Sequence, residues 1–241
     1  MKLSIIVPCY NEEKGISHLV AQLDPAVNEL KKDYDVELIL IDDGSTDNTY
    51  NLLKKYYSKK KGAIIIKHKK NMNLGGALKT GFKIASGDLV ATIDSDCTYP
   101  PKEIINMLKL MKDDVDIVTA SPYHPKGKVE NVPAYRLLLS KTISKLYSIL
   151  LNCRISTYTA LFRIYRKDVI KNIKNKSNDF LGVTEMLILP ILAGYKVVEY
   201  PTTLHVRKYG SSKIKLFNII FSHLKFLVKL INYKLFKISI K

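Results

Sequence analysis

The sequence has few cysteines and no long uninterrupted apolar run. Its three cysteines, Cys9, Cys97 and Cys153, are far apart and form no CxxC pair. This argues against a zinc site and against a disulfide framework, and it fits a reducing, cytosolic setting. Lysines interrupt even the most apolar segment, so no stretch reaches the roughly 20 apolar residues of a spanning helix. We expect a peripheral or monotopic protein without a transmembrane span.

Two further kinds of motif are absent. The N-terminal run is only five apolar residues long before Pro8 and lacks a small-residue cleavage site, so we interpret it as a first β-strand and not as a signal peptide. The glycine-rich stretch 71–81 matches neither GxxxxGK[ST] nor GxGxxG. It therefore argues against an ATP or dinucleotide site and favours close packing of a helix against a loop.

Acidic residues are scarce relative to basic ones. Lysine and arginine number 39 against 22 aspartates and glutamates, which gives a formal net charge of +17 over 241 residues. Such a charge requires an anionic partner: nucleic acid, phospholipid headgroups or a phosphorylated substrate. The chain lacks a motif for reading bases, and its lysines gather in an apolar tail and not among exposed aromatics. We therefore expect no nucleic acid partner.

The first half of the chain alternates short β-branched runs with amphipathic segments, a pattern typical of an α/β protein with a mainly parallel sheet. After about Ser121 the alternation gives way to a loop and a predicted helix, Pro133–Leu151. The tail, 214–241, has no acidic residue, and its polar side chains recur every three or four residues, which predicts a helix. The predicted strands are Leu3–Val7, Val36–Ile41, Ala63–Lys67, Leu89–Ile93, Ile117–Ala120 and Leu161–Tyr165.

Acidic residues follow three of the predicted strands. In open sheets, ligands bind beyond the carboxyl ends of the strands. Asp94 and Asp96, separated by one residue at such an end, can reach the same divalent cation, and oxygen ligands select Mg²⁺ or Mn²⁺. The alternative is that they cap the helix that the following prolines indicate.

The loop AspAspGlySerThrAsp (42–47) follows the second strand. Gly44 permits a tight turn, and the two leading acids are free to accept hydrogen bonds from a base or ribose; the alternative is that the loop only caps the next helix. Tyr10 offers a flat face for a nucleobase, although packing is the alternative, and Glu12 follows it in the same turn.

The ordered set ProCysTyrAsnGlu, AspAspGlySerThrAsp, the glycine-rich helix entry, AspSerAsp and ArgLysTyrGlySerSerLys (207–213) resembles the family 2 glycosyltransferases of GT-A fold. Within that family, the chain is similar to the polyprenol-phosphate type, which includes dolichol-phosphate mannosyltransferases. The resemblance covers residues 1–213 and implies a Rossmann-like catalytic domain. About 1–120 would form the nucleotide-sugar and metal half, and 121–213 the acceptor half.

The resemblance also implies roles for individual residues. Arg207 and Lys213 would grip the diphosphate, and Arg136 and Ser140, on a helix similar to the family's interfacial helix, would hold the acceptor phosphate. Asp96 would be both catalytic and a metal ligand. The nucleotide sugar would lie against Pro8, Tyr10, Glu12, Asp42, Asp43 and Asp94.

Three positions depart from the family's pattern. Pro122 stands where relatives have an arginine that can bind phosphate, Thr157 where they have an acid, and Thr98 where glutamine is frequent. A lipid monophosphate has a second pKa near ~6 and is already a nucleophile at neutral pH, so the missing acid at Thr157 favours a charged acceptor. A hydroxyl acceptor would need a positioned carboxylate, for which Glu185 is the candidate.

The sequence thus predicts an inverting transfer of a hexose from GDP-mannose or UDP-glucose to a polyprenyl (dolichyl) phosphate at the cytosolic face of a membrane. The alternative is a family 2 enzyme with a hydroxyl acceptor. The helix 133–151 and the tail combine apolar residues with lysines, which suits an anionic membrane surface. A core position for the helix, and pairing of the tail with a second subunit in a homo-oligomer, are the alternatives.

Overall fold

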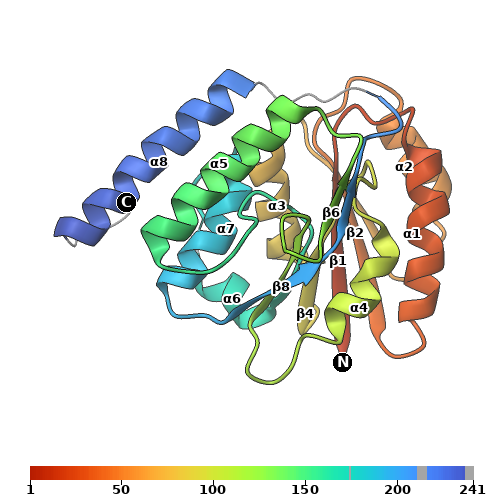
Figure 1. Cartoon of the computed structure of the whole chain (residues 1–241). Helices are drawn as coiled ribbons and strands as arrows, with labels where there is room; N and C mark the ends of the chain where they lie inside the picture. The colour runs from red at the N-terminus through yellow and green to blue at the C-terminus, as the bar shows by residue number, and fades with distance from the viewer. Residues whose placement is uncertain (174, 211–215, 237–241) are drawn as a thin grey trace.

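The computed structural model describes residues 1–173, 175–210 and 216–236, and a seven-stranded sheet lies at its centre (Figure 1). The strand order is β3-β2-β1-β4-β7-β5-β8. Strand β7 runs antiparallel to both of its neighbours, and all the other pairings in this sheet are parallel. The α/β class with a mainly parallel sheet is confirmed.

The elements have the following bounds. The strands are β1 (Lys2–Cys9), β2 (Asp35–Asp42), β3 (Ala63–Lys67), β4 (Leu89–Thr92), β5 (Ile117–Ser121), β6 (Lys128–Glu130), β7 (Arg163–Arg166), β8 (Val197–Pro201) and β9 (Thr203–His205). The helices are α1 (Ile16–Leu30), α2 (Thr49–Tyr57), α3 (Asn73–Ile84), the short 3-10 helix η1 (Pro101–Glu103), α4 (Ile104–Leu108), α5 (Ala134–Leu151), α6 (Lys167–Asn172), α7 (Leu181–Leu192) and α8 (Leu216–Phe236).

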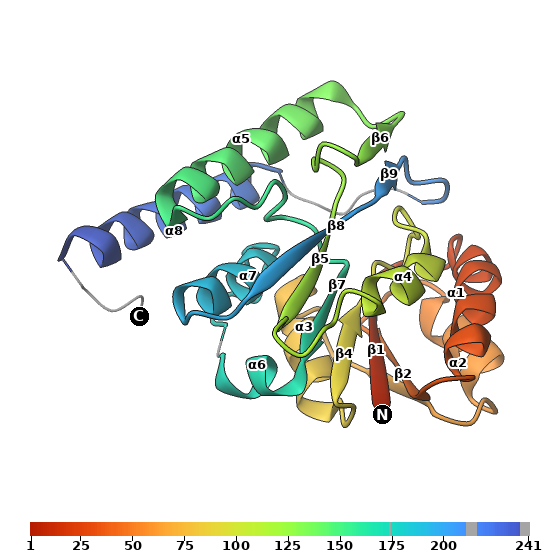
Figure 2. The same cartoon turned by 60° about the horizontal axis from the view of Figure 1, so that its bottom comes forward.

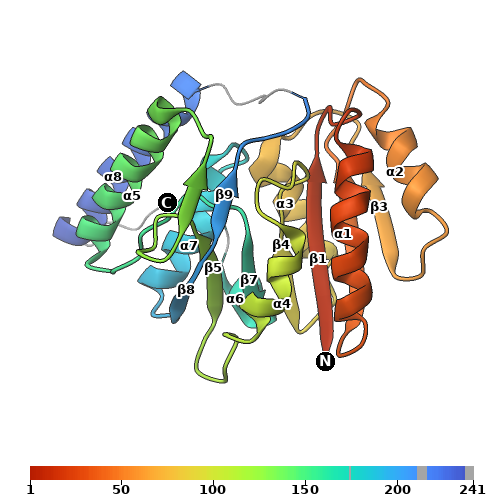
Figure 3. The same ribbon diagram turned by 45° about the vertical axis from the view of Figure 1, so that its right-hand side comes forward.

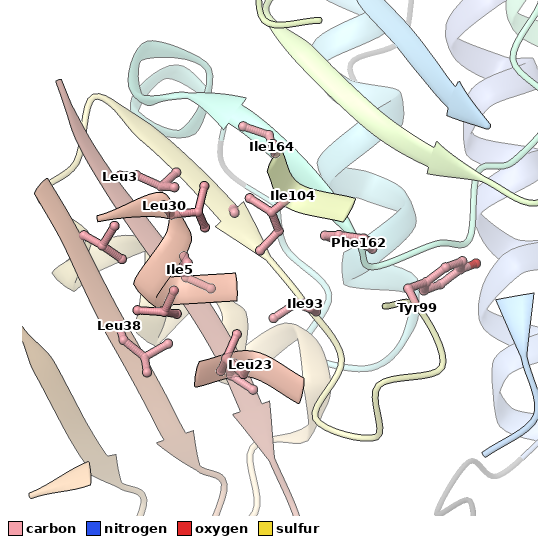
Figure 4. Packing of buried hydrophobic residues seen from close by; sticks show 14 of the residues in the cluster. Leu3, Ile5, Leu23, Leu30, Leu38, Ile93, Tyr99, Ile104, Phe162 and Ile164 are labelled. Atoms are coloured by element: carbon pink, nitrogen blue, oxygen red, sulfur yellow. The ribbon is translucent and has the colours of Figure 1, made fainter. Parts of the chain in front are cut away.

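The period-two alternation of the strands distributes their apolar side chains between two helical layers. Leu3 and Ile5 of β1 pack with α1 and α4 on one face, and Ile6 packs with α3 on the other. Figure 4 shows the first of these layers, with Leu23 of α1 and Ile104 of α4 among the strand residues. Both faces are covered, as a parallel sheet requires.

Helices α5 and α8 lie side by side outside these layers (Figures 2 and 3). They pack against the rest of the chain through a separate apolar cluster that includes Tyr147 of α5, Leu187 of α7 and Phe226 of α8. The hydroxyl of Tyr147 is 2.8 Å from Nδ1 of the buried His223. Helix α8 is therefore packed onto the protein through both apolar and polar contacts.

Helix α8 has three distinct faces. His223, Phe226 and Leu230 are buried, and the predicted polar stripe occupies a second face, at Asn218, Ser222, Lys225, Lys229 and Asn232. The third face is exposed and apolar, with Phe221, Leu224, Val228, Ile231 and Leu235 at spacings of three and four residues. The predicted helix is thus observed between Leu216 and Phe236, and the remaining part of the predicted tail lies outside the described residues.

In the described part of the chain, no helix combines the length and the apolar character needed to cross a membrane.

Candidate functional site

The carboxyl ends of β1, β2 and β4 meet at one edge of the sheet, because these strands are parallel and adjacent. Three loops begin there: residues 10–15 after β1, 43–48 after β2 and 93–100 after β4. Each loop contains at least one of the acidic residues that the sequence predicts to bind the nucleotide sugar or the cation. The structure therefore brings the candidate residues of the first half of the chain to one edge.

Hydrogen bonds join the first two loops. Asn11 adopts a left-handed backbone conformation with φ 53°, and its Oδ1 accepts a hydrogen bond of 2.8 Å from the amide of Thr46. Its own amide donates to Oγ of Ser45, at 3.0 Å. The amide of Glu12 donates to Oγ1 of Thr49, at 2.7 Å. Ser45 and Thr46 therefore fix the β1 loop and do not cap α2, for which no side-chain cap is present.

Asp42 and Asp43 have different environments. Asp42 is fully buried, and neither of its carboxylate oxygens has a hydrogen-bond partner among the described residues. Oδ1 of Asp43 lies 2.7 Å from Nδ1 of His68 and accepts a hydrogen bond of 2.9 Å from the amide of Met72. Burial raises the pKa of Asp43, and its contacts with His68 and Met72 oppose that rise. Asp43 is thus engaged within the protein, whereas both carboxylate oxygens of Asp42 are buried without a described partner.

The turn that follows Asp43 packs tightly against the loop between β3 and α3. Gly44 has φ 69°, and a Cβ atom added there would lie 2.5 Å from the carbonyl carbon of Lys70. At the start of α3, a Cβ on Gly75 would lie 2.5 Å from the carbonyl oxygen of Ser177. The predicted close packing of this glycine-rich helix against a loop is therefore confirmed.

Arg207 links the β1 loop to the β4 loop. Its Nη2 donates to Oε2 of Glu12, its Nη1 lies 3.9 Å from Oδ2 of Asp96, and its Nε donates to the carbonyl of Tyr209, at 2.6 Å. Burial raises the pKa of Glu12, and the guanidinium of Arg207 opposes this rise. The arginine predicted to grip a diphosphate is thus held beside the predicted metal ligand. Lys213 lies outside the described residues.

Asp94 and Asp96 do not cap the helix that follows them. The 3-10 turn at Pro101 and helix α4 have no side-chain cap, and Oδ1 of Asp96 accepts a hydrogen bond of 3.1 Å from the amide of Thr98 within the loop. Burial, followed by the charge of Asp96, raises the pKa of Asp94 to about 8. The two carboxylates supply hard oxygen donors of the kind that a divalent cation prefers.

The described parts of the chain contain no cluster of three or more His, Cys, Asp or Glu side chains suited to a metal ion. A cation on Asp94 and Asp96, which stays a prediction, would need its other ligands from water or from the oxygens of a bound ligand. This donor set of hard oxygens matches Mg²⁺ and Mn²⁺.

The predicted acceptor residues lie on α5. Oγ of Ser140 is 2.7 Å from Oγ1 of Thr159, whereas Nε of the exposed Arg136 donates to the hydroxyl of its neighbour Tyr135, at 3.2 Å. The hydrogen bonds thus tie Ser140, but not Arg136, to another part of the fold. Both remain predictions as acceptor ligands.

Thr157, which stands in place of the family's acid, is buried, and its Oγ1 lies 2.8 Å from Oγ of Ser121. The carboxylate of Glu199 accepts hydrogen bonds from the amides of Ser156 and Thr157, at 2.8 and 3.2 Å. This segment is therefore held by an acid that comes from β8.

Glu185, the candidate base for a hydroxyl acceptor, is buried and engaged. Its Oε2 accepts hydrogen bonds from the amides of Lys176 and Ser177, at 2.9 and 2.8 Å, and its Oε1 accepts one of 2.7 Å from Oγ of Ser177. These bonds fix the loop before α7. They give Glu185 a structural role, and its action as a base for a hydroxyl acceptor stays a prediction.

Sequence reasoning missed His68 and its contact with the predicted site residue Asp43. His68 is 2.9 Å from Oγ1 of Thr80 in addition to its contact with Asp43, so it connects β3, α3 and the β2 loop. The available signal was its place directly after the predicted strand Ala63–Lys67, at the edge where the acids lie. Pro8, within β1, and Tyr10, half-buried just after it, also lie at this edge, and their contact with a nucleoside stays a prediction.

Comparison with known proteins identifies the same family that the sequence motifs resemble. Residues 4–174 match the model of the family described as glycosyl transferase family 2. The chain is 34% identical over 236 residues to a dolichol-phosphate mannosyltransferase of Pyrococcus furiosus. This match covers 97% of the chain and 65% of the relative, so the chain spans about two thirds of that protein's length.

Among solved structures, the fold resembles glucosyl-3-phosphoglycerate synthase of Mycobacterium tuberculosis. The complex of that enzyme with Mn²⁺, UDP and glucosyl-3-phosphoglycerate superposes with a TM-score of 0.69 at 18% identity, over 97% of this chain and 79% of the other. Its complex with Mg²⁺ and UDP gives a TM-score of 0.68 with the same identity and coverage. At this identity the likeness concerns the fold.

Proposed function

Because the chain belongs to glycosyltransferase family 2, we propose that it transfers a hexose from a nucleotide sugar, GDP-mannose or UDP-glucose, to a polyprenyl phosphate such as dolichyl phosphate. The observation that carries the proposal is the edge where Asp94 and Asp96 lie beside Arg207, with the unpartnered carboxylate of Asp42 buried in the same edge. At such an edge, Asp42 would bind the nucleoside, Arg207 the diphosphate, and the pair Asp94 and Asp96 the cation.

Two relatives support this choice. The Pyrococcus furiosus protein is named a dolichol-phosphate mannosyltransferase. The Mycobacterium tuberculosis enzyme was crystallised with UDP and either Mn²⁺ or Mg²⁺, and two of its structures contain UDP-glucose. A nucleotide-sugar donor and a divalent metal are therefore the natural assignments for the site of this chain.

Asp94 and Asp96 would hold Mg²⁺ or Mn²⁺, which when bound supplies Lewis-acid stabilisation of the leaving diphosphate. Side chains of the protein would supply further stabilisation of the leaving group. Charge develops on the leaving phosphate as the bond to the anomeric carbon breaks, and the guanidinium of Arg207 is placed to neutralise it. Glu12 and the carbonyl of Tyr209 hold that guanidinium in place. Lys213 would add a second cation.

The acceptor needs no strong base in this scheme. A phosphomonoester with a second pKa near ~6 carries a nucleophilic oxygen at neutral pH. Thr157 in place of an acid and the engaged carboxylate of Glu185 are both compatible with such an acceptor. Direct attack on the anomeric carbon inverts its configuration.

The acceptor's lipid requires access from a membrane surface. Helices α5 and α8 expose apolar side chains, among them Leu138 and Ile149 on α5 and Phe221 and Val228 on α8, and carry several lysines. Such helices suit attachment to the surface of an anionic membrane. We place the protein at the cytosolic face as a peripheral or monotopic enzyme.

Incubation of membranes containing the protein with a panel of labelled sugar nucleotides tests the proposal. Polyprenyl phosphate and Mg²⁺ or Mn²⁺ are supplied, lipid is extracted, and the label in the lipid is counted. One donor should deliver its label to lipid, and membranes without the protein are the control. If no donor labels lipid under any of these conditions, the proposal fails.

A further inference from the structure

The loop 175–180, which precedes α7, connects α8 to the start of α3. Oγ of Ser222, on α8, donates a hydrogen bond of 2.7 Å to Oδ2 of Asp179 in this loop. The backbone carbonyl of Asp179 accepts a hydrogen bond of 3.2 Å from the amide of Gly75, in the first turn of α3. One short loop thus contacts both a helix outside the sheet layers and a helix that begins beside the acidic edge.

The start of α3 belongs to the edge proposed for the donor. The amide of Met72, directly before the helix, donates a hydrogen bond of 2.9 Å to Oδ1 of Asp43. A Cβ atom on Gly44 would lie 2.5 Å from the carbonyl carbon of Lys70, so the segment leading into α3 packs directly on the β2 loop. This loop begins beside Asp42, the buried acid proposed to bind the nucleoside. A shift of α3 would therefore disturb the donor site.

Helix α3 and the loop pack without room for an added methyl group. A Cβ atom on Gly75 would lie 2.5 Å from the carbonyl oxygen of Ser177, and one on Gly182 would lie 2.7 Å from the same atom. Nζ of Lys79, on α3, donates to the carbonyl of Lys176, at 2.6 Å. Close-packed contacts of this kind transmit strain, so a displacement of the loop passes to α3.

Asp179 takes part in the docking of α8 as well as in the start of α7. One of its carboxylate oxygens accepts the hydroxyl of Ser222, and the other accepts the amide of Leu181, at 3.0 Å. The residue after Ser222, His223, is buried, and its ring lies 2.8 Å from the hydroxyl of Tyr147 on α5. Ser222 therefore belongs to the contact between α8 and the body of the protein, and the apolar face of α8 stays exposed.

We propose that Asp179 is a positioning residue for the donor site, and that its hydrogen bond with Ser222 couples the docking of α8 to nucleotide binding beside α3. This inference rests on the proposed function and deepens it by naming a regulation of the same site. With α8 docked, the loop is held by Ser222 and in turn holds the first turn of α3. By linkage, a bound nucleotide stabilises the docked helix in return. Because α8 also exposes the apolar face proposed to meet a membrane, the hydrogen bond connects the two proposed binding surfaces.

Calorimetry of the full chain with GDP and with UDP, each with Mg²⁺ and without lipid, tests the coupling. Ser222→Ala should weaken the binding of whichever nucleotide the wild type binds by about fivefold, a usual size for coupling between two sites. Ser222→Thr, which keeps the hydroxyl, should retain most of the affinity. The matched control Asn218→Ala, at an exposed position one turn earlier on the same polar stripe, should leave it unchanged. In the transfer assay, Ser222→Ala should raise KM for the sugar nucleotide and leave kcat nearly unchanged.

Val115→Ala separates the coupling from a general loss of stability. Val115 is buried just before β5, at the end of the sheet opposite the donor edge. The cavity left by this substitution should lower the melting temperature without changing the affinity for the nucleotide. Unchanged affinity in Ser222→Ala would overturn the inference, as would an equal loss of affinity in Asn218→Ala or Val115→Ala.

Hydrogen exchange measures the same coupling from the side of α8. Saturating nucleotide should slow the exchange of the α8 amides severalfold in the wild type, and much less in Ser222→Ala. If the exchange of α8 in the wild type does not respond to the nucleotide, the coupling is refuted. If a nucleotide binds and the wild type labels lipid but the variants behave alike, only the coupling is lost. If neither GDP nor UDP binds the wild type and no label enters lipid, the proposed function fails and the inference with it.

Discussion

At the scale of single residues, Arg207 is the centre of the candidate site. It contacts the carboxylate of Glu12, the carbonyl of Tyr209 and, at 3.9 Å, Asp96. Because the guanidinium is planar and its donors point in fixed directions, these contacts hold it in one orientation. A group fixed before the reaction costs no reorganisation when charge develops beside it.

We predict that Asp96→Asn lowers kcat about a hundredfold or more while leaving the fold intact. The substitution removes one of two carboxylates at the predicted cation site, and with it much of the stabilisation of the leaving diphosphate. The measurement is label transfer to lipid over a range of Mg²⁺ and Mn²⁺ concentrations. Asp113→Asn, at an exposed aspartate, is the control. A variant with unchanged kcat would refute the role of Asp96.

The sequence allowed the acids of the site to be predicted but not their pairing. Asp42, Asp94 and Asp96 follow strands, and parallel strands necessarily end at one edge. Glu12 and Arg207 are 195 residues apart, and no local pattern indicates that they touch. The same holds for His68 and Asp43, because a contact between side chains depends on rotamers and loop paths that periodicity does not encode.

At the scale of elements, a buried histidine lies in the contact between α8 and α5. His223 has an exposed fraction of 4% and lies 2.8 Å from the hydroxyl of Tyr147. Its removal from water lowers the pKa of His223 from its ordinary value of 6.5 to about 4, although the nearby Asp179 opposes this. Protonating the ring in the packed helix is therefore unfavourable.

We predict that the protein loses stability as the pH falls from about 6.5 to 4. The unfolded histidine binds a proton in this range and the folded one does not, so acid favours the unfolded state. At about 1.4 kcal/mol per pKa unit, the loss reaches roughly 3 kcal/mol at pH 4. Denaturant unfolding at several pH values measures it.

In the same series, His223→Gln should make the free energy of unfolding depend less on pH. The control, His124→Gln, should leave that dependence unchanged. An unchanged slope for His223→Gln would show that other groups cause the acid lability.

The predicted strands of the first half agree with the observed ones to within one or two residues, because each is a short β-branched run between turns. Strands β6, β8 and β9 were not anticipated. Val197–Pro201 contains a glutamate and a proline, and β6 and β9 have three residues each, so their existence depends on pairing with distant segments. The antiparallel direction of β7 likewise follows from tertiary contacts.

At the scale of the whole molecule, charge and apolar surface occur together on one pair of helices. The chain has a net charge of +17, and α8 exposes Phe221, Leu224 and Val228 beside Lys225. Apolar insertion and attraction to anionic headgroups would then act in the same place. Salt weakens the electrostatic attraction but not the apolar insertion, so an experiment at two salt concentrations can separate the two contributions.

We predict that the protein binds phosphatidylglycerol vesicles and that raising the salt from 0.1 to 1 M weakens this binding severalfold, because the screening length falls from about 10 to 3 Å. Phe221→Ser should weaken binding at both salt concentrations, since it removes an exposed apolar group. Met72→Ser, at an exposed apolar residue on another part of the surface, serves as the control. Cosedimentation measures the bound fraction, and equal effects of the two substitutions would contradict the assignment of α8.

The place of β7 in the sheet has a consequence for synthesis on the ribosome. Strand β7 separates β4 from β5, yet it is made some seventy residues after β4. Until Arg163–Arg166 has emerged, a nascent chain presents the hydrogen-bonding edge of β4 without the neighbour it has in the finished protein. Such open edges invite association with other chains. We therefore expect the nascent chain to be most open to association through β4 in the interval between the emergence of the two strands.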